Sequence, residues 1–95
     1  MTLTISEVRF SPASEHDVRF GLLGYVSFAL DSGLRVSGVT VRRTADGRTA
    51  LSFPGRRNKR GEMRPYMRPV SRDSRAAIEA QVFAAIQLPE ADPWQ

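Results

Sequence analysis

The stretch VTVRRTADGRTALSFPGRRNKRGEMRPYMRP, residues 39–69, decides how the rest of the chain can fold. It starts as a strand rich in β-branched residues, turns at Ala45-Asp46-Gly47 and returns through residues 49–53. Asp-Gly between two apolar runs favours a tight hairpin, because Gly reaches positive φ without steric cost and Asp hydrogen-bonds its own backbone. We therefore predict two antiparallel strands that meet at this turn, followed by a loop that starts at Pro54-Gly55.

Positive charge is concentrated in and after this hairpin. Residues 42–72 hold ten Arg and Lys and two acids, a local charge of +8, whereas the whole chain carries +4, so the other residues sum to −4. Such segregation is the electrostatic signature of a polyanionic partner. The candidate nucleic-acid contacts are Arg42, Arg43, Arg48, Arg56, Arg57, Lys59, Arg60, Arg64, Arg72 and Arg75.

Arginine suits phosphate because its planar guanidinium donates two parallel hydrogen bonds and stays charged at physiological pH. Pro54-Gly55 and Gly61 predict a loop mobile enough to follow a curved backbone. Only Phe53 and Tyr66 could stack on bases nearby, which favours contact with phosphates. The alternative is a solvated loop without a partner. At the start of the helix, Arg72 and Arg75 could bind an anion, or Arg75 could pair with Glu79 four residues on.

The rest of the chain predicts more strands and one helix. Residues 3–10, 20–30 and 34–43 read as strands. The apolar parity changes near Ser6-Glu7, which indicates either a bulge there or partial cover of both faces, and it changes again near Gly38, which suggests a bulge. Residues 11–17 are polar and read as a loop, and residues 63–69 as a short extended edge segment. The run 20–30 is apolar on both parities, so we expect a core on one face and a helix or a second chain on the other.

The last predicted element is an amphipathic helix. Ile78, Val82 and Ile86 recur at helical spacing after a cap at Ser71 or Asp73, and Pro89 would end the helix. The predicted fold class is therefore α+β: an antiparallel sheet of four to five strands followed by one C-terminal amphipathic helix. We expect a single domain over residues 1–88 and a short tail over 89–95, in which Trp94 could fold back onto the body.

The residues that enzymes and metal sites use are sparse. His16 is the single His and lies in a polar segment, while Asp31 and Asp46 lie at turns, where Asp is favoured for backbone hydrogen bonding. No carboxylate pair, paired-His motif or phosphate-binding loop is present in the sequence. We expect no catalytic activity, no cofactor and no metal. The absence of Cys, of a signal peptide and of a membrane-spanning run predicts a cytoplasmic protein.

Several short segments share their order and spacing with one known family: ISEVR at 5–9, LLGYVS at 22–27, residues 34–43, DGR at 46–48, LSFP at 51–54, Gly61, Pro69, RAAIE at 75–79 and Val82. Together they resemble the SpoVG family (stage V sporulation protein G, the septation regulator) over residues 4–87. The resemblance implies a small bacterial cytoplasmic homodimer with a sheet followed by a helix. It also implies site-selective DNA binding, RNA binding in some members, and regulation of gene expression, septation and sporulation.

The resemblance assigns nucleic-acid contacts to basic residues near the start of the helix, here Arg72 and Arg75. The functional prediction is thus a homodimeric regulator that binds DNA, with RNA as a further ligand, and that binds neither membranes nor a small-molecule substrate. The alternative is a protein-interaction module that pairs a sheet edge with a partner and uses the basic residues on an acidic protein surface.

Overall fold

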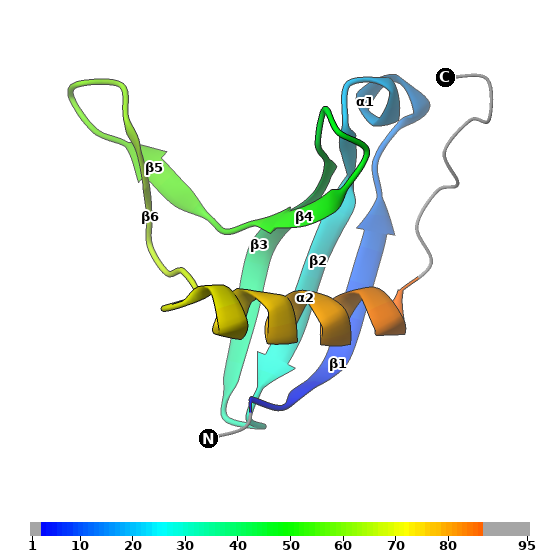
Figure 1. Cartoon of the computed structure of the whole chain (residues 1–95), viewed down its shortest axis with the longest axis vertical. Helices are drawn as coiled ribbons and strands as arrows, with labels where there is room; N and C mark the ends of the chain where they lie inside the picture. The colour runs from blue at the N-terminus through cyan, green and yellow to red at the C-terminus, as the bar shows by residue number, and fades with distance from the viewer. Residues whose placement is uncertain (1–2, 87–95) are drawn as a thin grey trace.

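A four-stranded antiparallel sheet crossed on one face by a helix forms the body of the protein (Figure 1). The structure is a computed structural model that describes residues 3–86. The strands pair in chain order: β1 (Ile5–Pro12), β2 (Leu22–Leu30), β3 (Leu34–Arg43) and β4 (Thr49–Ser52). The helix α2 (Arg72–Ala85) follows them in the chain. The predicted α+β fold, with its antiparallel sheet and C-terminal helix, is confirmed.

The predicted hairpin joins β3 to β4. Its strands pair from Thr40 opposite Ser52 to Arg43 opposite Thr49. Between them, the backbone N–H of Thr44 donates to the carbonyl of Arg48 at 2.7 Å, and Gly47 adopts a φ of 85°. The turn at Ala45-Asp46-Gly47 is therefore confirmed, with Gly at the position that needs positive φ.

Both predicted bulges are present and explain the changes in apolar parity. The register of β1 against β2 shifts between Ser6 and Arg9, where Glu7 has a φ of 47°. The register of β2 against β3 shifts where Gly38 adopts a φ of 76°. An extra residue turns the side chains that follow it to the other face of the strand. Apolar residues on both sides of each bulge can therefore point into one core.

That core lies between the sheet and α2. A third register shift, between Leu22 and Gly24, brings Leu23 into it beside Val26 and Phe28. The bulges thus account for much of the double apolar parity of residues 20–30 within one chain, where α2 supplies the cover of one face. The buried cluster comprises Leu23, Val26, Phe28, Val36, Val39, Val41, Leu51, Ile78 and Val82.

The helix α2 begins and packs as predicted. Ser71 is the N-cap, and its hydroxyl accepts a hydrogen bond from the N–H of Ser74 at 3.1 Å. Ile78 and Val82 are buried and Ile86 packs against the cluster. The helix ends at Ala85; Pro89 and the predicted tail 89–95, with Trp94, lie outside the described residues.

Helix α2 crosses one face of the sheet (Figure 1). Its side chains bond to backbone groups at both edges of the sheet, which fixes this crossing. Gln81 accepts from the N–H of Ile5 at 2.9 Å and donates to the carbonyl of Leu3 at 2.8 Å. At the opposite edge, Glu79 accepts from the N–H of Leu51 at 2.8 Å. Edge strands present unpaired backbone groups, so these bonds occupy groups that would otherwise be open to another chain.

The predicted loop over residues 11–17 is wrong. The strand β1 continues to Pro12, which is tolerated because β1 is an edge strand, and a short helix α1 (Glu15–Arg19) follows. The hydroxyl of Ser14 caps α1 by accepting from the N–H of Asp17 at 3.2 Å. A good N-cap and acidic residues in the first turn thus offset the polar composition of this segment.

Among residues 3–86, no helix is long and apolar enough to cross a membrane.

Candidate nucleic-acid interface

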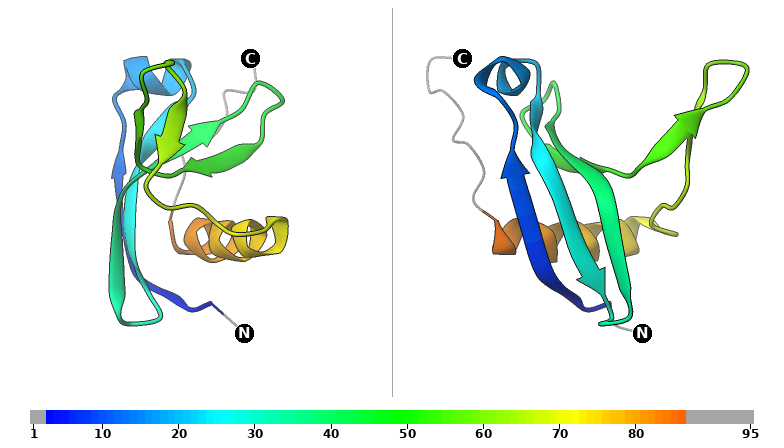
Figure 2. Two further views of the ribbon diagram at one scale, coloured as in Figure 1. Left: turned by 90° about the vertical axis from the view of Figure 1, so that its left-hand side faces the viewer. Right: turned by 180° about the vertical axis from the view of Figure 1, so that it is seen from behind.

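The basic segment after β4, which we predicted as a loop, is a projecting β-hairpin. It consists of β5 (Gly55–Arg57) and β6 (Met63–Pro65), which form a second sheet separate from the main one. The two strands pair with Gly55 opposite Pro65, Arg56 opposite Arg64 and Arg57 opposite Met63. This hairpin, residues 55–65 and called the arm below, extends away from the body in Figure 1 and in the right view of Figure 2. The predicted extended segment 63–69 is a strand only over its first three residues.

The tip of the arm is ordered by one side chain, Asn58. Its Oδ1 accepts from the N–H groups of Arg60 at 2.9 Å and Glu62 at 3.0 Å. The N–H of Asn58 donates to the carbonyl of Glu62 at 2.9 Å, and Gly61 completes the turn with a φ of 81°. Arg57 also donates from Nη1 to the carbonyl of Gly61 at 2.8 Å. Local hydrogen bonds of this kind give the tip a defined turn.

Glycine is required at the base of the arm by the close approach of β6. A Cβ at Gly55 would lie 2.5 Å from the carbonyl oxygen of Arg64 and 2.6 Å from the Cα of Pro65. Both contacts are with backbone, which cannot move aside without breaking the strand pair. Gly55 is therefore required for the pairing of β5 with β6, a role that was not predicted from the sequence.

The charge of the arm is nearly all positive. It holds five cations, Arg56, Arg57, Lys59, Arg60 and Arg64, against the single acid Glu62, a net charge of +4. Glu62 lies 3.6 Å from Arg64. Because residues directly opposite in a ladder share a face, Arg56 and Arg64 place two like charges side by side. All five cationic side chains are on exposed residues, so the arm presents its charge to solvent.

The structure divides the ten predicted contact residues into three groups. Arg56, Arg57, Lys59, Arg60 and Arg64 are together on the arm. Arg42, Arg43 and Arg48 are at the β3–β4 end of the main sheet, which lies apart from the arm in Figures 1 and 2. Arg72 and Arg75 begin α2. The arm is thus the largest of the three groups, because it holds five of the ten predicted contact residues on one exposed element.

At the β3–β4 turn, Asp46 offsets part of the positive charge. Its carboxylate lies 3.3 Å from Nε of Arg48 and accepts a hydrogen bond from the hydroxyl of Thr44. This hydroxyl and the N–H of Arg48 hold the pKa of Asp46 below its usual value. Hydrogen bonds to a carboxylate favour its charged form, so the acid of this turn remains ionised and local to Arg48.

At the start of α2, the two arginines differ. Arg75 donates from Nη1 to the carbonyl of Leu51 at 3.0 Å and lies 3.4 Å from Oε2 of Glu79. Since Glu79 also accepts from the N–H of Leu51, Arg75 and Glu79 together join α2 to β4. Arg72 is exposed and has no hydrogen bond or ion pair among residues 3–86. The i,i+4 pairing considered for Arg75 is therefore present, and Arg72 is the more accessible cation.

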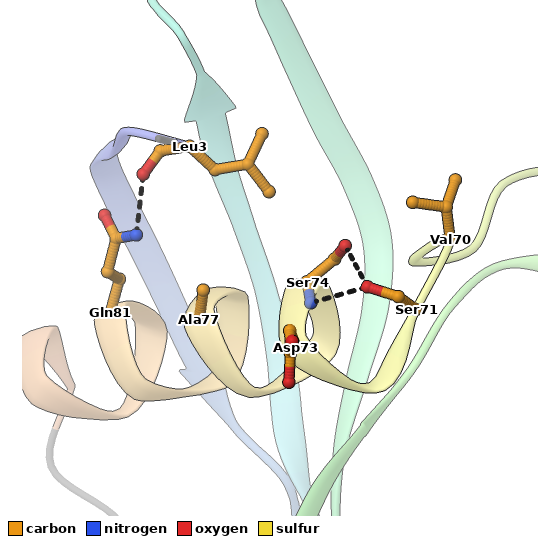
Figure 3. Close-up of a pocket in the computed structure, with 7 residues that line it drawn as sticks. All are labelled: Leu3, Val70, Ser71, Asp73, Ser74, Ala77 and Gln81. Atoms are coloured by element: carbon orange, nitrogen blue, oxygen red, sulfur yellow. Dashed lines mark hydrogen bonds between the residues drawn. The ribbon is translucent and has the colours of Figure 1, made fainter. Parts of the chain in front are cut away.

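A hollow of about 450 Å³ runs beside the start of α2, between Val70 and Leu3 (Figure 3). Its polar groups bond to one another: the hydroxyls of Ser71 and Ser74 lie 2.8 Å apart, and Gln81 binds the backbone of Leu3. Asp73 is the single residue with a titratable side chain among those that line the hollow. Within the described part of the chain, no group of three or more His, Asp or Glu is placed to hold a metal ion.

Sequence reasoning missed the residues that shape the arm, Asn58 and Glu62. An Asn followed by a Gly three residues later is a turn signal that could have located the tip. The pairing of β5 with β6, which sets Gly55 opposite Pro65, had no such local signal in the sequence, because it depends on the approach of two backbones.

Comparison with known proteins gives one group of relatives. No protein-family model matches the chain. Two curated proteins named "Putative septation protein SpoVG", from Borreliella burgdorferi strains ZS7 and B31, are each 26% identical to it over 81 residues. The alignment covers 85% of this chain and 82% of each relative. The resemblance to the SpoVG family that the sequence predicted is thus confirmed across most of the chain.

Proposed function

We propose that this chain is a homodimeric, nucleic-acid-binding regulator of the bacterial cytoplasm that grips the phosphates of duplex DNA with its arm, and that also binds RNA. The observation that carries the proposal is the arm itself, an exposed two-stranded ribbon with five cations and one acid. Phosphate contacts made by Arg and Lys supply most of the affinity of proteins for nucleic acids. The SpoVG resemblance supports the same function.

The construction of the arm supports a bound polyanion. An isolated two-stranded hairpin is marginally stable in water, and like charges directly opposite each other destabilise a ladder. The arm combines both features, because Arg56 faces Arg64 across a ribbon whose outer residues are exposed. A phosphate between the two guanidiniums would relieve their repulsion. A two-stranded ribbon also has the width that the major groove of B-DNA admits.

The alternative, a module that binds a partner by adding a strand, has less support. Glu79 and Arg75 occupy the backbone N–H and carbonyl of Leu51 on β4. Gln81 occupies backbone groups of Leu3 and Ile5 at the beginning of β1, and Pro12 ends that strand. An incoming strand at either edge would meet side chains of α2 or a proline.

A second copy of the chain would cover the apolar side chains exposed near the arm. Met63, Tyr66, Met67 and Val70 follow one another through β6 and the link to α2, and Val70 is 93% exposed. Leu34, from the β2–β3 end, and Met67 line one apolar hollow of about 170 Å³. Exposed apolar groups gathered in this way mark an association surface. A dimer formed there would bring two arms onto one molecule.

The test removes charge from the arm without changing its hydrogen bonds. Arg56, Lys59 and Arg60 make no side-chain hydrogen bond or ion pair within residues 3–86, unlike Arg57 and Arg64. We expect the triple Gln variant of these three residues to remain folded by circular dichroism. It should bind specific and random duplex DNA more weakly by similar factors, because phosphate contacts position a protein without reading sequence.

The slope of log K against log salt should also become less steep, by about 0.9 for each lost contact. Arg19→Gln is the matched control, since it removes an exposed cation from α1, outside the arm. A folded triple variant with the affinity and slope of the parent would exclude the arm from the binding site. Binding of the parent chain to an acidic protein, but not to duplex DNA, would favour the protein-interaction module.

A further inference from the structure

The face of the main sheet opposite α2 is not covered by any helix or strand of residues 3–86, and it carries a polar surface of its own. Figure 2 shows α2 on one side of the sheet only. The core takes Val26, Val39, Val41 and Leu51, so their neighbours in sequence point to the other side. One cross-strand row on that side is Ser11, Tyr25, Thr40 and Ser52, each opposite the next. Tyr25 is therefore the single aromatic of a row whose other members are small.

Tyr25 is accessible in the middle of this face. It lies on β2, one of the two inner strands, and is 48% exposed. Its direct neighbours Ser11 and Thr40 are too short to cover a phenol ring. Its hydroxyl has no hydrogen bond to residues 3–86. A half-exposed aromatic with a free hydroxyl, set among Ser and Thr, offers both a ring face and a polar group to a ligand.

Two arginines flank Tyr25 on opposite diagonals of the sheet. Arg9 on β1 pairs with Ser27, one row to one side of Tyr25, and Arg42 on β3 pairs with Ala50, one row to the other side. Diagonal neighbours lie about 7–8 Å apart, so the line from Arg9 through Tyr25 to Arg42 spans about 15 Å. Both arginines are exposed and have no ionic partner in the described chain.

A third arginine on this face is already fixed in place. Arg35 donates to the hydroxyl of Ser27 at 3.0 Å and to the carbonyl of Glu7 at 3.1 Å, and lies 4.0 Å from the carboxylate of Glu7. With three arginines and Glu7, the set carries a charge of +2. The face thus combines positive charge at both ends of a diagonal with an aromatic ring between them.

We propose that this sheet face, through Arg9, Tyr25 and Arg42, binds a single-stranded segment of nucleic acid. Tyr25 stacks on a base, and Arg9 and Arg42 contact the flanking phosphates. Four-stranded sheets with exposed aromatics hold two or three bases in this way in other proteins, and stacking tolerates any base because each has a π-face. The inference rests on the proposed function and adds to it a second surface with a different ligand.

Duplex DNA does not fit this face as well as a single strand does. Four strands at about 4.8 Å spacing are about 15 Å across before side chains are added, whereas the major groove is about 12 Å wide. In a duplex the base faces are stacked on each other, so the ring of Tyr25 has nothing to stack on. A second copy docked face to face would set its Arg9 and Arg42 against the same positive surface, which is unfavourable without a bound anion.

The test uses the full chain and labelled ten-nucleotide probes, oligo-dT and oligo-rU, beside a duplex of the same length. We expect Tyr25→Ala to lower the affinity for both single strands by about 5- to 150-fold, the usual loss for a stacked base. Tyr25→Phe keeps the ring and should bind within about twofold of the parent. Arg9→Gln and Arg42→Gln should each weaken single-strand binding, whereas Arg19→Gln on α1 should not. Affinity for the duplex should be unchanged in the Tyr25 variants.

The outcomes separate this proposal from the function proposed for the arm. If Tyr25→Ala binds single strands like the parent while the triple arm variant loses duplex affinity, the sheet-face proposal is wrong and the arm proposal stands. If Tyr25→Ala instead changes the oligomeric state in sedimentation, the face is covered by a second copy and the proposal is also wrong. Equal losses with oligo-dT and oligo-rU support stacking and phosphate contact; a loss with oligo-rU alone would add recognition of the 2′-hydroxyl to it.

Discussion

At the scale of single residues, the clearest dependence of structure on one side chain is at Glu79. Its Oε2 accepts from the N–H of Leu51 at 2.8 Å and lies 3.4 Å from Nη1 of Arg75, which in turn donates to the carbonyl of Leu51. Leu51 is 2% exposed, so its N–H has little access to water as a substitute partner. Glu79 therefore supports both the buried edge of β4 and the side chain of Arg75.

We predict that Glu79→Ala lowers the free energy of unfolding by about 1–3 kcal/mol, the cost of an unsatisfied buried donor. Glu79→Gln retains an amide oxygen that can accept from Leu51, and it should lose less. Urea unfolding of both variants measures the difference. Equal stability of the Ala and Gln variants would show that the bond to Leu51 contributes nothing.

Asp46 gives a prediction that depends on pH. Its pKa lies below the usual value of 3.8, first because the hydroxyl of Thr44 donates to it and then because the N–H of Arg48 does. A carboxyl whose folded pKa is lowered stabilises the fold above its unfolded pKa and loses that contribution as pH falls through the folded pKa. The contribution of Asp46 is thus complete at neutral pH and is lost below about pH 4. Thr44→Val should raise the pKa of Asp46 towards 3.8, as an NMR titration of its carboxyl would measure; an unchanged pKa would mean that the Thr44 hydroxyl has no effect.

At the scale of elements, α2 is the part on which the core depends most. Val82 is fully buried between α2 and the sheet. We predict that Val82→Asp unfolds the domain or leaves it without fixed packing, because it buries an unpaired charge at a cost of several kcal/mol. Ala80→Asp is the matched control, since it places the same charge on an exposed position of the same helix. Thermal unfolding compares the two, and a parent-like melting temperature for Val82→Asp would contradict the packing of α2.

Elements with a periodic apolar pattern could be predicted from the sequence, and those built by local hydrogen bonds or close backbone contacts could not. The four strands of the main sheet, the Asp46-Gly47 turn and the helix with Ile78 and Val82 followed from apolar runs, helical spacing and turn chemistry. The arm did not, because its two strands, GRR and MRP, have no apolar alternation, and because its pairing depends on Gly55 lying against β6. The helix α1 was missed because its polar composition outweighed the cap at Ser14.

The predicted site shows the same division. Counting charge found the basic residues, because clustering of arginines is visible in the sequence itself. It could not distinguish Arg75, which binds the carbonyl of Leu51, from Arg72, which is exposed without a partner in residues 3–86. Charge counting also passed over Arg9 and Tyr25, since their position on one open face follows from strand register.

At the scale of the whole molecule, the proposed dimer decides how many phosphates can be neutralised at once. Two arms with incomplete engagement would neutralise about 6–8 phosphates, which gives a slope of log K against log salt of roughly −5 to −7 on duplex DNA. One arm would give about half that slope. The salt dependence therefore reports the number of arms in contact with the duplex, independently of the sequence bound.

We predict that the parent chain is a dimer at about tens of micromolar, the range expected of a stable dimer, and that Leu34→Gln/Val70→Ser is a folded monomer. Both side chains are exposed in the single chain, at 58% and 93%, so removing their apolar surface should cost association and not folding. The uncharged replacements leave the arm unchanged, so the salt slope should fall to about half only because one arm is lost. Light scattering and the salt titration measure the two effects together. A parent that scatters as a monomer, or a monomeric variant that keeps the full slope, would show that a single arm accounts for all the phosphate contacts.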